Sequence, residues 1–131
     1  MARVESVPNR LRTAVFTFTI VGAPDYEFSV GGNTYVIGSI PPGAIVTDQI
    51  VDVTTPLAQE GGGLAPQVTL SYSSGQTILS QRTFTAAPYD ASGPVQVAIT
   101  PFKTASSVDI TWNVNANVLG AGTVTVFVQY L

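Results

Sequence analysis

The sequence predicts an all-β protein: an antiparallel β-sandwich or jelly roll of about eight to nine strands, preceded by an extended N-terminal arm. β-Branched and aromatic residues recur in short runs, and clusters of Gly, Pro, Asn, Asp and Ser separate these runs about every 8 to 15 residues. No segment keeps the apolar period of a helix for about ten residues. A chain of 131 residues fits one domain, which we expect at residues 13–131 behind an arm at residues 1–12.

The first part of the domain carries its strand signals in a clear order. Residues 13–21 alternate in hydrophobicity, which predicts a strand with one face on the core. The residues that should face the core are Ala14, Phe16, Phe18 and Ile20. Segments 26–30 and 34–37 flank the Gly-Gly-Asn run at 31–33, which predicts a β-hairpin with positive φ in its turn. The Pro-Pro pair at 41–42 should then end the ladder and redirect the chain.

The later strands follow between loops rich in Gly and Pro. We expect them at residues 44–54, 67–73, 77–85, 94–100, 107–116 and 122–131. The segments "PLAQEGGGLAP" (56–66) and "AAPYDASGP" (86–94) are predicted to be surface loops. Trp112 alternates with apolar neighbours in the strand at 107–116, so we interpret it as a core residue and not as an exposed sugar-binding platform.

Charge is scarce and unevenly distributed. Charged residues make up 10% of the chain and apolar residues 45%, so neutral Ser, Thr, Asn and Gln must form most of the polar surface. Such groups are buried against a partner at a smaller desolvation penalty than charges, which favours an assembly component. Three arginines against Glu5 give the first twelve residues a charge of +2, whereas Arg82 and Lys103 against seven carboxylates leave −5 on the rest.

The charge pattern and hydropathy exclude two classes of partner. Three arginines in the arm are too few to indicate a nucleic-acid-binding protein, which needs clustered cations to release counterions. Neither a signal-peptide core nor a run of about 18 uncharged apolar residues is present, so the sequence predicts no contact with a membrane. We expect a soluble protein that is synthesised in a cytoplasm.

The absence of Cys and His removes most catalytic chemistry. Ser-His-Asp and Cys-His arrangements are impossible, and the commonest metal ligand is missing. Asp48 and Asp52, four residues apart on a strand, should be separated by about 13 Å at 3.3 Å per residue, too far for a glycosidase pair or a shared metal ion. We therefore expect no enzymatic activity, cofactor or metal. The two aspartates are interpreted as solvent-facing, with a β-bulge near Asp48 or Gln49 restoring the alternation.

Three segments resemble small structural proteins of tailed bacteriophages: "GSIPPGAIVTDQIVDVTTPL" (38–57), "GPVQVAIT" (93–100) and "GAGTVTVFVQYL" (120–131). The matching positions are Gly43, Ile45, Val46, Val53, Thr54, Thr55, Gly93, Val95, Val97, Ala121, Gly122, Val124, Val126, Val128 and Tyr130. The family is that of capsid decoration (cement) and head-fibre proteins.

The resemblance implies a homotrimer on the outer surface of a phage head, where it bridges major capsid proteins and stabilises the shell. The arm residues expected to contact the capsid are Arg3, Val4, Val7, Arg10 and Arg12. Two alternatives remain open at this point. One is a receptor- or carbohydrate-binding tip of a phage fibre, with "QEGGGL" (59–64) and "PYDASG" (88–93) as recognition loops; the other is a jelly-roll coat or tail component.

Overall fold

The computed structural model describes residues 11–60, 66–83, 88–89, 91–115 and 118–131, which form two antiparallel sheets packed face to face. The strands are β1 (Arg12–Val21), β2 (Thr34–Ile40), β3 (Ile45–Gln59), β4 (Gln67–Tyr72), β5 (Thr77–Thr83), β6 (Gly93–Val97), β7 (Phe102–Lys103), β8 (Val108–Val114) and β9 (Leu119–Tyr130). In these described residues there is no helix. The predicted all-β sandwich is confirmed.

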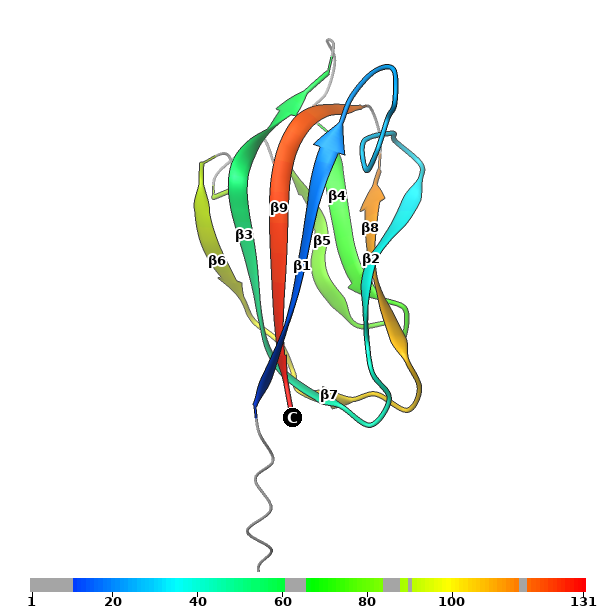
Figure 1. Cartoon of the computed structure of the whole chain (residues 1–131), viewed down its shortest axis with the longest axis vertical. Coiled ribbons are helices and arrows are strands. Elements are labelled where there is room, and N and C mark those ends of the chain that lie inside the picture. The colour runs from blue at the N-terminus through cyan, green and yellow to red at the C-terminus, as the bar shows by residue number, and fades with distance from the viewer. Residues whose placement is uncertain (1–10, 61–65, 84–87, 90, 116–117) are drawn as a thin grey trace, which may run out of the picture.

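The strand order identifies the sandwich as a jelly roll. The first sheet has the order β1-β9-β3-β6, with the short β7 paired to β3, and the second has the order β2-β8-β4-β5. Except between β4 and β5 and between β6 and β7, each connection carries the chain from one sheet to the other (Figure 1). Apart from the short β7, each sheet has four strands, and two four-stranded sheets wound in this way are the architecture of a jelly roll.

One predicted element, the hairpin of 26–30 with 34–37, is wrong. Residues 26–30 form only isolated bridges, Val21 to Glu27 and Val30 to Val118, and β2 pairs with β8 instead. Tyr26 and Phe28 have positive φ angles of 50° and 55°, which interrupt an extended strand. Of the Gly-Gly-Asn turn, only the second glycine, Gly32, has a positive φ.

Strand β3 is longer than expected because it passes through a proline. It continues to Gln59 instead of ending near Thr54, and the register with β9 shifts around Pro56, where no ladder partner is required. The predicted bulge is confirmed, since the same ladder shifts between Val46 and Asp48. This shift directs Val46 into the core and Asp48 outward, as the sequence pattern requires.

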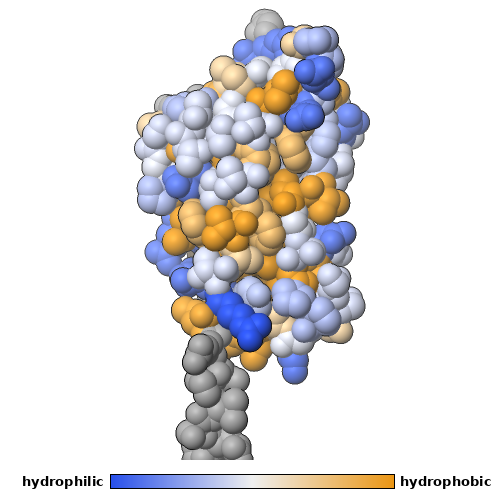
Figure 2. All heavy atoms as spheres, viewed as in Figure 1, coloured by the Kyte–Doolittle hydropathy of each residue, from blue (hydrophilic) through white to orange (hydrophobic). Residues whose placement is uncertain are grey.

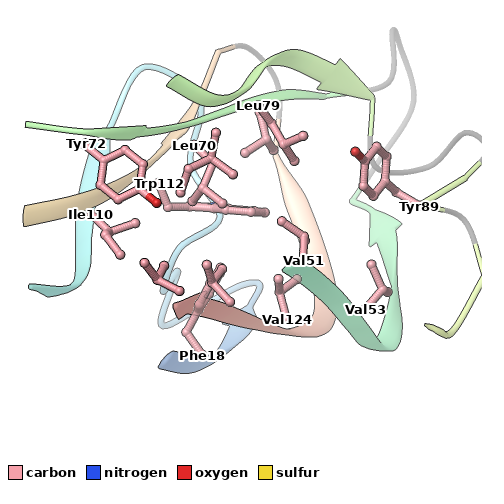
Figure 3. Close-up of a cluster of buried hydrophobic side chains, with 14 of the residues drawn as sticks. Phe18, Val51, Val53, Leu70, Tyr72, Leu79, Tyr89, Ile110, Trp112 and Val124 are labelled. Atoms are coloured by element: carbon pink, nitrogen blue, oxygen red, sulfur yellow. The ribbon is translucent and has the colours of Figure 1, made fainter. Parts of the chain in front are cut away.

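Trp112 lies at the centre of the core, as predicted (Figure 3). Its side chain has no exposed surface, and its ring meets that of Phe18 edge-on at 4.8 Å between centroids. The indole Nε1 donates a 2.9 Å hydrogen bond to the carbonyl of Phe28. The positive φ of Phe28 thus belongs to a turn whose carbonyl satisfies the one polar atom of the buried indole.

A second buried polar contact joins the two sheets. The Tyr72 hydroxyl on β4 donates a 2.8 Å hydrogen bond to Oε1 of Gln49 on β3, and both side chains are almost wholly buried. Gln49 in turn donates through Nε2 to the carbonyl of Ala98 at 3.3 Å. Because burying an unpaired amide is costly, this contact favours one position of β3 relative to β4 across the two sheets.

Alkaline pH is expected to destabilise the protein through Tyr72. Burial raises the pKa of the Tyr72 phenol above its ordinary value near 10, so the unfolded chain releases this proton at a lower pH than the folded one. The contribution of this raised pKa to the free energy of unfolding is complete below about pH 10. It is lost as the pH rises further, by up to about 1.4 kcal/mol per pH unit. Urea unfolding at pH 9 and pH 11 should show a smaller fall in unfolding free energy for Tyr72→Phe than for the wild type. Equal falls would contradict this assignment.

Candidate interaction surface

The outer faces of the two sheets differ in chemistry. Side chains on the outer face of the first sheet are aligned in rows by the β1–β9 and β9–β3 ladders. One row consists of Val15, Phe127 and Ile50, which are direct partners across three neighbouring strands. None of the three belongs to the buried core, and Val15 is 52% exposed.

A second apolar row lies at the end of the sheet where β1 begins and β9 ends. Ile45 and Leu131 exchange two backbone hydrogen bonds of 3.1 and 2.9 Å, and Leu11 precedes the residue that pairs with Tyr130. Leu11, Ile45 and Leu131 are each at least 39% exposed. Four of the six large hydrophobic side chains exposed among the described residues therefore lie on β1, β3, β9 or directly beside them. We call the two rows together the apolar face.

Apart from Asp48 and Asp52 on β3, neutral side chains make up most of the remaining surface of this sheet. Thr17 and Thr125 are hydrogen-bonded at 2.9 Å, and Thr19 and Thr123 at 3.3 Å, so their hydroxyls are already paired with one another. Such side chains lose little when a partner excludes water from them, because their hydrogen bonds persist. Figure 2 shows this side of the molecule, with exposed hydrophobic side chains in its middle and at its lower end, separated mainly by weakly polar ones.

The outer face of the second sheet has the opposite character. The row that corresponds to Val15, Phe127 and Ile50 consists of Val36, Thr111 and Ser71. Thr111 and Ser71 are joined by a 3.1 Å hydrogen bond, and Val36, 59% exposed, stands at the sheet edge. Contiguous exposed apolar side chains mark contact sites in soluble proteins, whereas single ones do not. The first sheet is therefore the better candidate for a contact surface.

Asp48 and Asp52 lie on the outer side of β3, as the sequence predicts, with Ile50 between them. Asp48 accepts hydrogen bonds from the backbone of Gln49 at 2.9 Å and from Gln96 Nε2 at 3.3 Å. Among the described residues, no group of three or more Asp, Glu, His or Cys side chains is placed to hold a metal ion. Asp48, the ladder partner of Gln129, therefore lies between the two apolar rows, and Asp52, the partner of Thr125, lies on the other side of the first row.

The arm residues are only partly within the described structure. Arg12 is the first residue of β1, is exposed and pairs with Tyr130, at the end of the sheet that carries the second apolar row. The other four expected contact residues, Arg3, Val4, Val7 and Arg10, lie outside the described residues. The expectation that these residues contact a capsid stays a prediction.

The expected recognition loops give a mixed result. Tyr89 is the aromatic residue of "PYDASG", and it is only 6% exposed and packs with the core. Its ring is therefore not an open platform for a ligand. Most of "QEGGGL" lies outside the described residues. Sequence reasoning missed the apolar face, because which strands lie side by side was not known. Within the described ranges, no helix is long and apolar enough to cross a membrane.

Comparisons with known proteins identify the fold. No protein-family model matches the chain, and no curated protein matches it. A chain in the capsid asymmetric unit of cyanophage Pam1 superposes with a TM-score of 0.64 at 18% identity, covering 99% of this chain and 90% of that one. A chain in the capsid of Ralstonia phage GP4 gives a TM-score of 0.61 at 20% identity, covering 100% and 90%.

A third structure extends the likeness to a further phage. A chain in the acid-stable capsid of Helicobacter pylori bacteriophage KHP30 gives a TM-score of 0.50 at 15% identity, with 93% and 92% covered. At these identities the likeness establishes a shared fold that spans nearly the whole of each chain. The resemblance noted in the sequence is confirmed to that extent: the chain has the fold of chains found in phage capsids.

Proposed function

We propose that this protein is a structural component of a bacteriophage particle, a capsid decoration (cement) protein that binds the outer surface of the head and stabilises the shell. The observation that carries the proposal is the fold it shares, end to end, with chains from three phage capsids. The composition supports the same role, since a chain without Cys or His has few means of catalysis. A binding role without enzymatic activity follows from this reading.

In the proposed mechanism, three copies assemble through the apolar face. Val15, Ile50 and Phe127 supply apolar contact area, and the paired threonines around them are buried with little loss of hydrogen bonding. A second copy is the favoured occupant because this surface is mostly neutral and its polar groups satisfy one another. The outer face of the second sheet, made largely of Ser, Thr and Asn, would remain in water.

The arm at residues 1–12 is proposed to contact the major capsid protein. The arm has a charge of +2, whereas the rest of the chain is acidic. An acidic partner surface would therefore attract the arm more strongly than it would attract the domain. Arg3, Arg10 and Arg12 would form charge-assisted hydrogen bonds, and Val4 and Val7 would add apolar contacts. A ligand that binds only the assembled shell stabilises that shell by mass action, and many copies on one head multiply the effect.

Charge placed in the apolar face is expected to abolish self-association. Val15→Asp should convert the trimer to monomers in light scattering, because an unpaired carboxylate buried in a contact costs several kcal/mol. Val36→Asp is the matched control, since Val36 is similarly exposed on an edge strand of the other sheet. If both variants kept the wild-type mass, or if the wild type were a monomer at micromolar concentration, the apolar face would not be the trimer contact.

Binding to emptied phage heads tests the proposed function directly. The wild type should co-sediment with heads of its own phage and raise the temperature at which they break open. Neutralising the arm with Arg3→Gln, Arg10→Gln and Arg12→Gln should weaken this binding and make it less sensitive to salt. Failure of the wild type to bind heads at low and at physiological salt would reject decoration as the function.

A further inference from the structure

The two edges of the sandwich are closed in different ways. At the edge formed by β1 and β2, Phe16 packs against Gly38 across the gap between the sheets. At the opposite edge, β5 and β6 are the last strands of their sheets, and a cleft of about 630 Å³ opens between them. A volume of this size lies in the range of small-molecule sites, about 300 to 1,000 Å³.

The cleft is lined by hydrogen-bonding side chains. Its wall on β5 carries Ser80, Gln81 and Arg82, and its wall on β6 carries Gln96. The described lining contains no carboxylate, although the body of the protein is acidic. One of the only two cations beyond the arm, Arg82, is placed here, so the described lining carries one positive charge.

The backbone of β5 is distorted at this wall. The four residues of β5 from Leu79 to Arg82 span the same stretch as the three residues of β4 from Val68 to Leu70, so β5 contains a bulge. Within it Gln81 has a φ of 47°, an uncommon conformation for a residue other than Gly. Bulges redirect side chains beside binding sites, and here the strand changes from two buried residues to the exposed Ser80, Gln81 and Arg82.

Two contacts orient the polar groups. Asp48 accepts a hydrogen bond from Gln96 Nε2 at 3.3 Å, which orients the Gln96 amide. At the base of the cleft, Tyr89 lies near Arg82: burial raises the pKa of the Tyr89 phenol, and the guanidinium lowers it in part. The cleft thus has an apolar base, with a cation, two amides and a hydroxyl around it.

From this arrangement we infer that the cleft between β5 and β6 binds an acidic saccharide, a second function beyond attachment to the shell. The guanidinium group of Arg82 can donate two parallel hydrogen bonds to the carboxylate of a uronic acid. The amides of Gln81 and Gln96 and the hydroxyl of Ser80 both donate and accept, which matches sugar hydroxyl groups. An acidic surface glycan would bind at the edge formed by β5 and β6, away from Val15 on the edge strand β1.

The test uses the full-length protein on an array of glucose, galactose, N-acetylglucosamine and rhamnose oligosaccharides together with glucuronic- and galacturonic-acid oligomers. We expect binding to the uronic-acid oligomers that is at least about tenfold weaker for Arg82→Ala, which removes the charge-assisted pair. Gln81→Asn, which tolerates positive φ but shortens the side chain, should also weaken binding. Lys103→Ala is the matched control, because it removes an exposed cation outside the cleft.

Amide chemical-shift changes on titration with the bound oligomer should map to β5 and β6. The inference is overturned by an array without signal, by binding of neutral sugars alone, or by binding that Arg82→Ala leaves unchanged. Preferential binding of an acidic peptide in the same titration would also overturn it. Head binding separates this result from the proposed function: Arg82→Ala should still decorate heads, so loss of either activity can be observed without the other.

Discussion

Replacing Trp112 with alanine is expected to lower the free energy of unfolding by about 3 to 5 kcal/mol, the largest effect of any single truncation in this chain. Trp112 has no exposed surface and is the largest fully buried side chain. Its strand is central in the second sheet, where it pairs with Tyr35 on one side and Leu70 on the other. The substitution removes the edge-on contact with Phe18 and also leaves the Phe28 carbonyl without its indole donor.

Far-ultraviolet circular dichroism during urea unfolding is the suitable measurement, because Trp112 is the only tryptophan and fluorescence would be lost with it. Since small domains are stable by about 5 to 15 kcal/mol in total, Trp112→Ala is expected to leave a measurable unfolded fraction. Trp112→Phe keeps a ring in place and should give an intermediate, measurable loss. Val36→Ala, at an exposed position of the neighbouring strand, should change stability by less than about 0.5 kcal/mol. A loss below about 1 kcal/mol for Trp112→Ala would contradict its central role.

Local alternation was sufficient to predict which residues face the core. In β8, Val108, Ile110, Trp112 and Val114 are all buried, and the break in alternation at Asp48 correctly predicted a bulge. These features depend on residues next to one another in the chain, where the period of two of a strand is directly readable. The jelly-roll order was not readable in this way, because its ladders pair strands far apart in the sequence, such as β1 with β9.

The wrong hairpin has a tertiary cause. Tyr26, Phe28 and Val30 alternate like a strand, and glycines follow them, which is a strong local signal for a hairpin. The Phe28 ring instead packs on Phe18 and Tyr35, and its carbonyl receives the Trp112 indole. Contacts with three other strands outweighed the local preference, and the chain turned where the sequence predicted a strand.

The apolar face could be predicted only in part. Alternation puts Val15 on the face of its strand opposite the predicted core residues, separates Phe127 from Val126 and Val128, and groups Ile50 with the two aspartates. Each of these, taken singly, is an ordinary exposed hydrophobic residue that needs no explanation. Only the register of β1, β9 and β3 shows that the three lie in one row. The cleft could not be predicted either, because it lies between β5 and β6, and local alternation does not show which strands lie at the sheet edges.

The substitution Gly38→Ala, which adds a single methyl group, is expected to lower the free energy of unfolding by about 1 to 3 kcal/mol. This is the second large effect that we expect from a single substitution. A Cβ atom at this position would lie within the van der Waals radius of the Phe16 ring, three atoms of which are its nearest neighbours. Phe16 belongs to the first sheet and Gly38 to the second, so the ring closes this edge of the sandwich over a residue without a side chain. Gly38 also lies where the β2–β8 register shifts, which limits relief by sliding of the strand.

A double-mutant cycle separates this contact from the general effect of Gly→Ala in a strand, which by itself is stabilising. If the ring is the cause, Gly38→Ala combined with Phe16→Ala should be less destabilising than the sum of the two single changes by at least about 1 kcal/mol. The matched cycle pairs Gly38→Ala with Val15→Ala, on the same strand but the opposite face, and should be additive within about 0.5 kcal/mol. Additivity in both cycles would mean that Phe16 tolerates the methyl group by moving aside, and that this edge of the sandwich is less tightly closed than the contact implies.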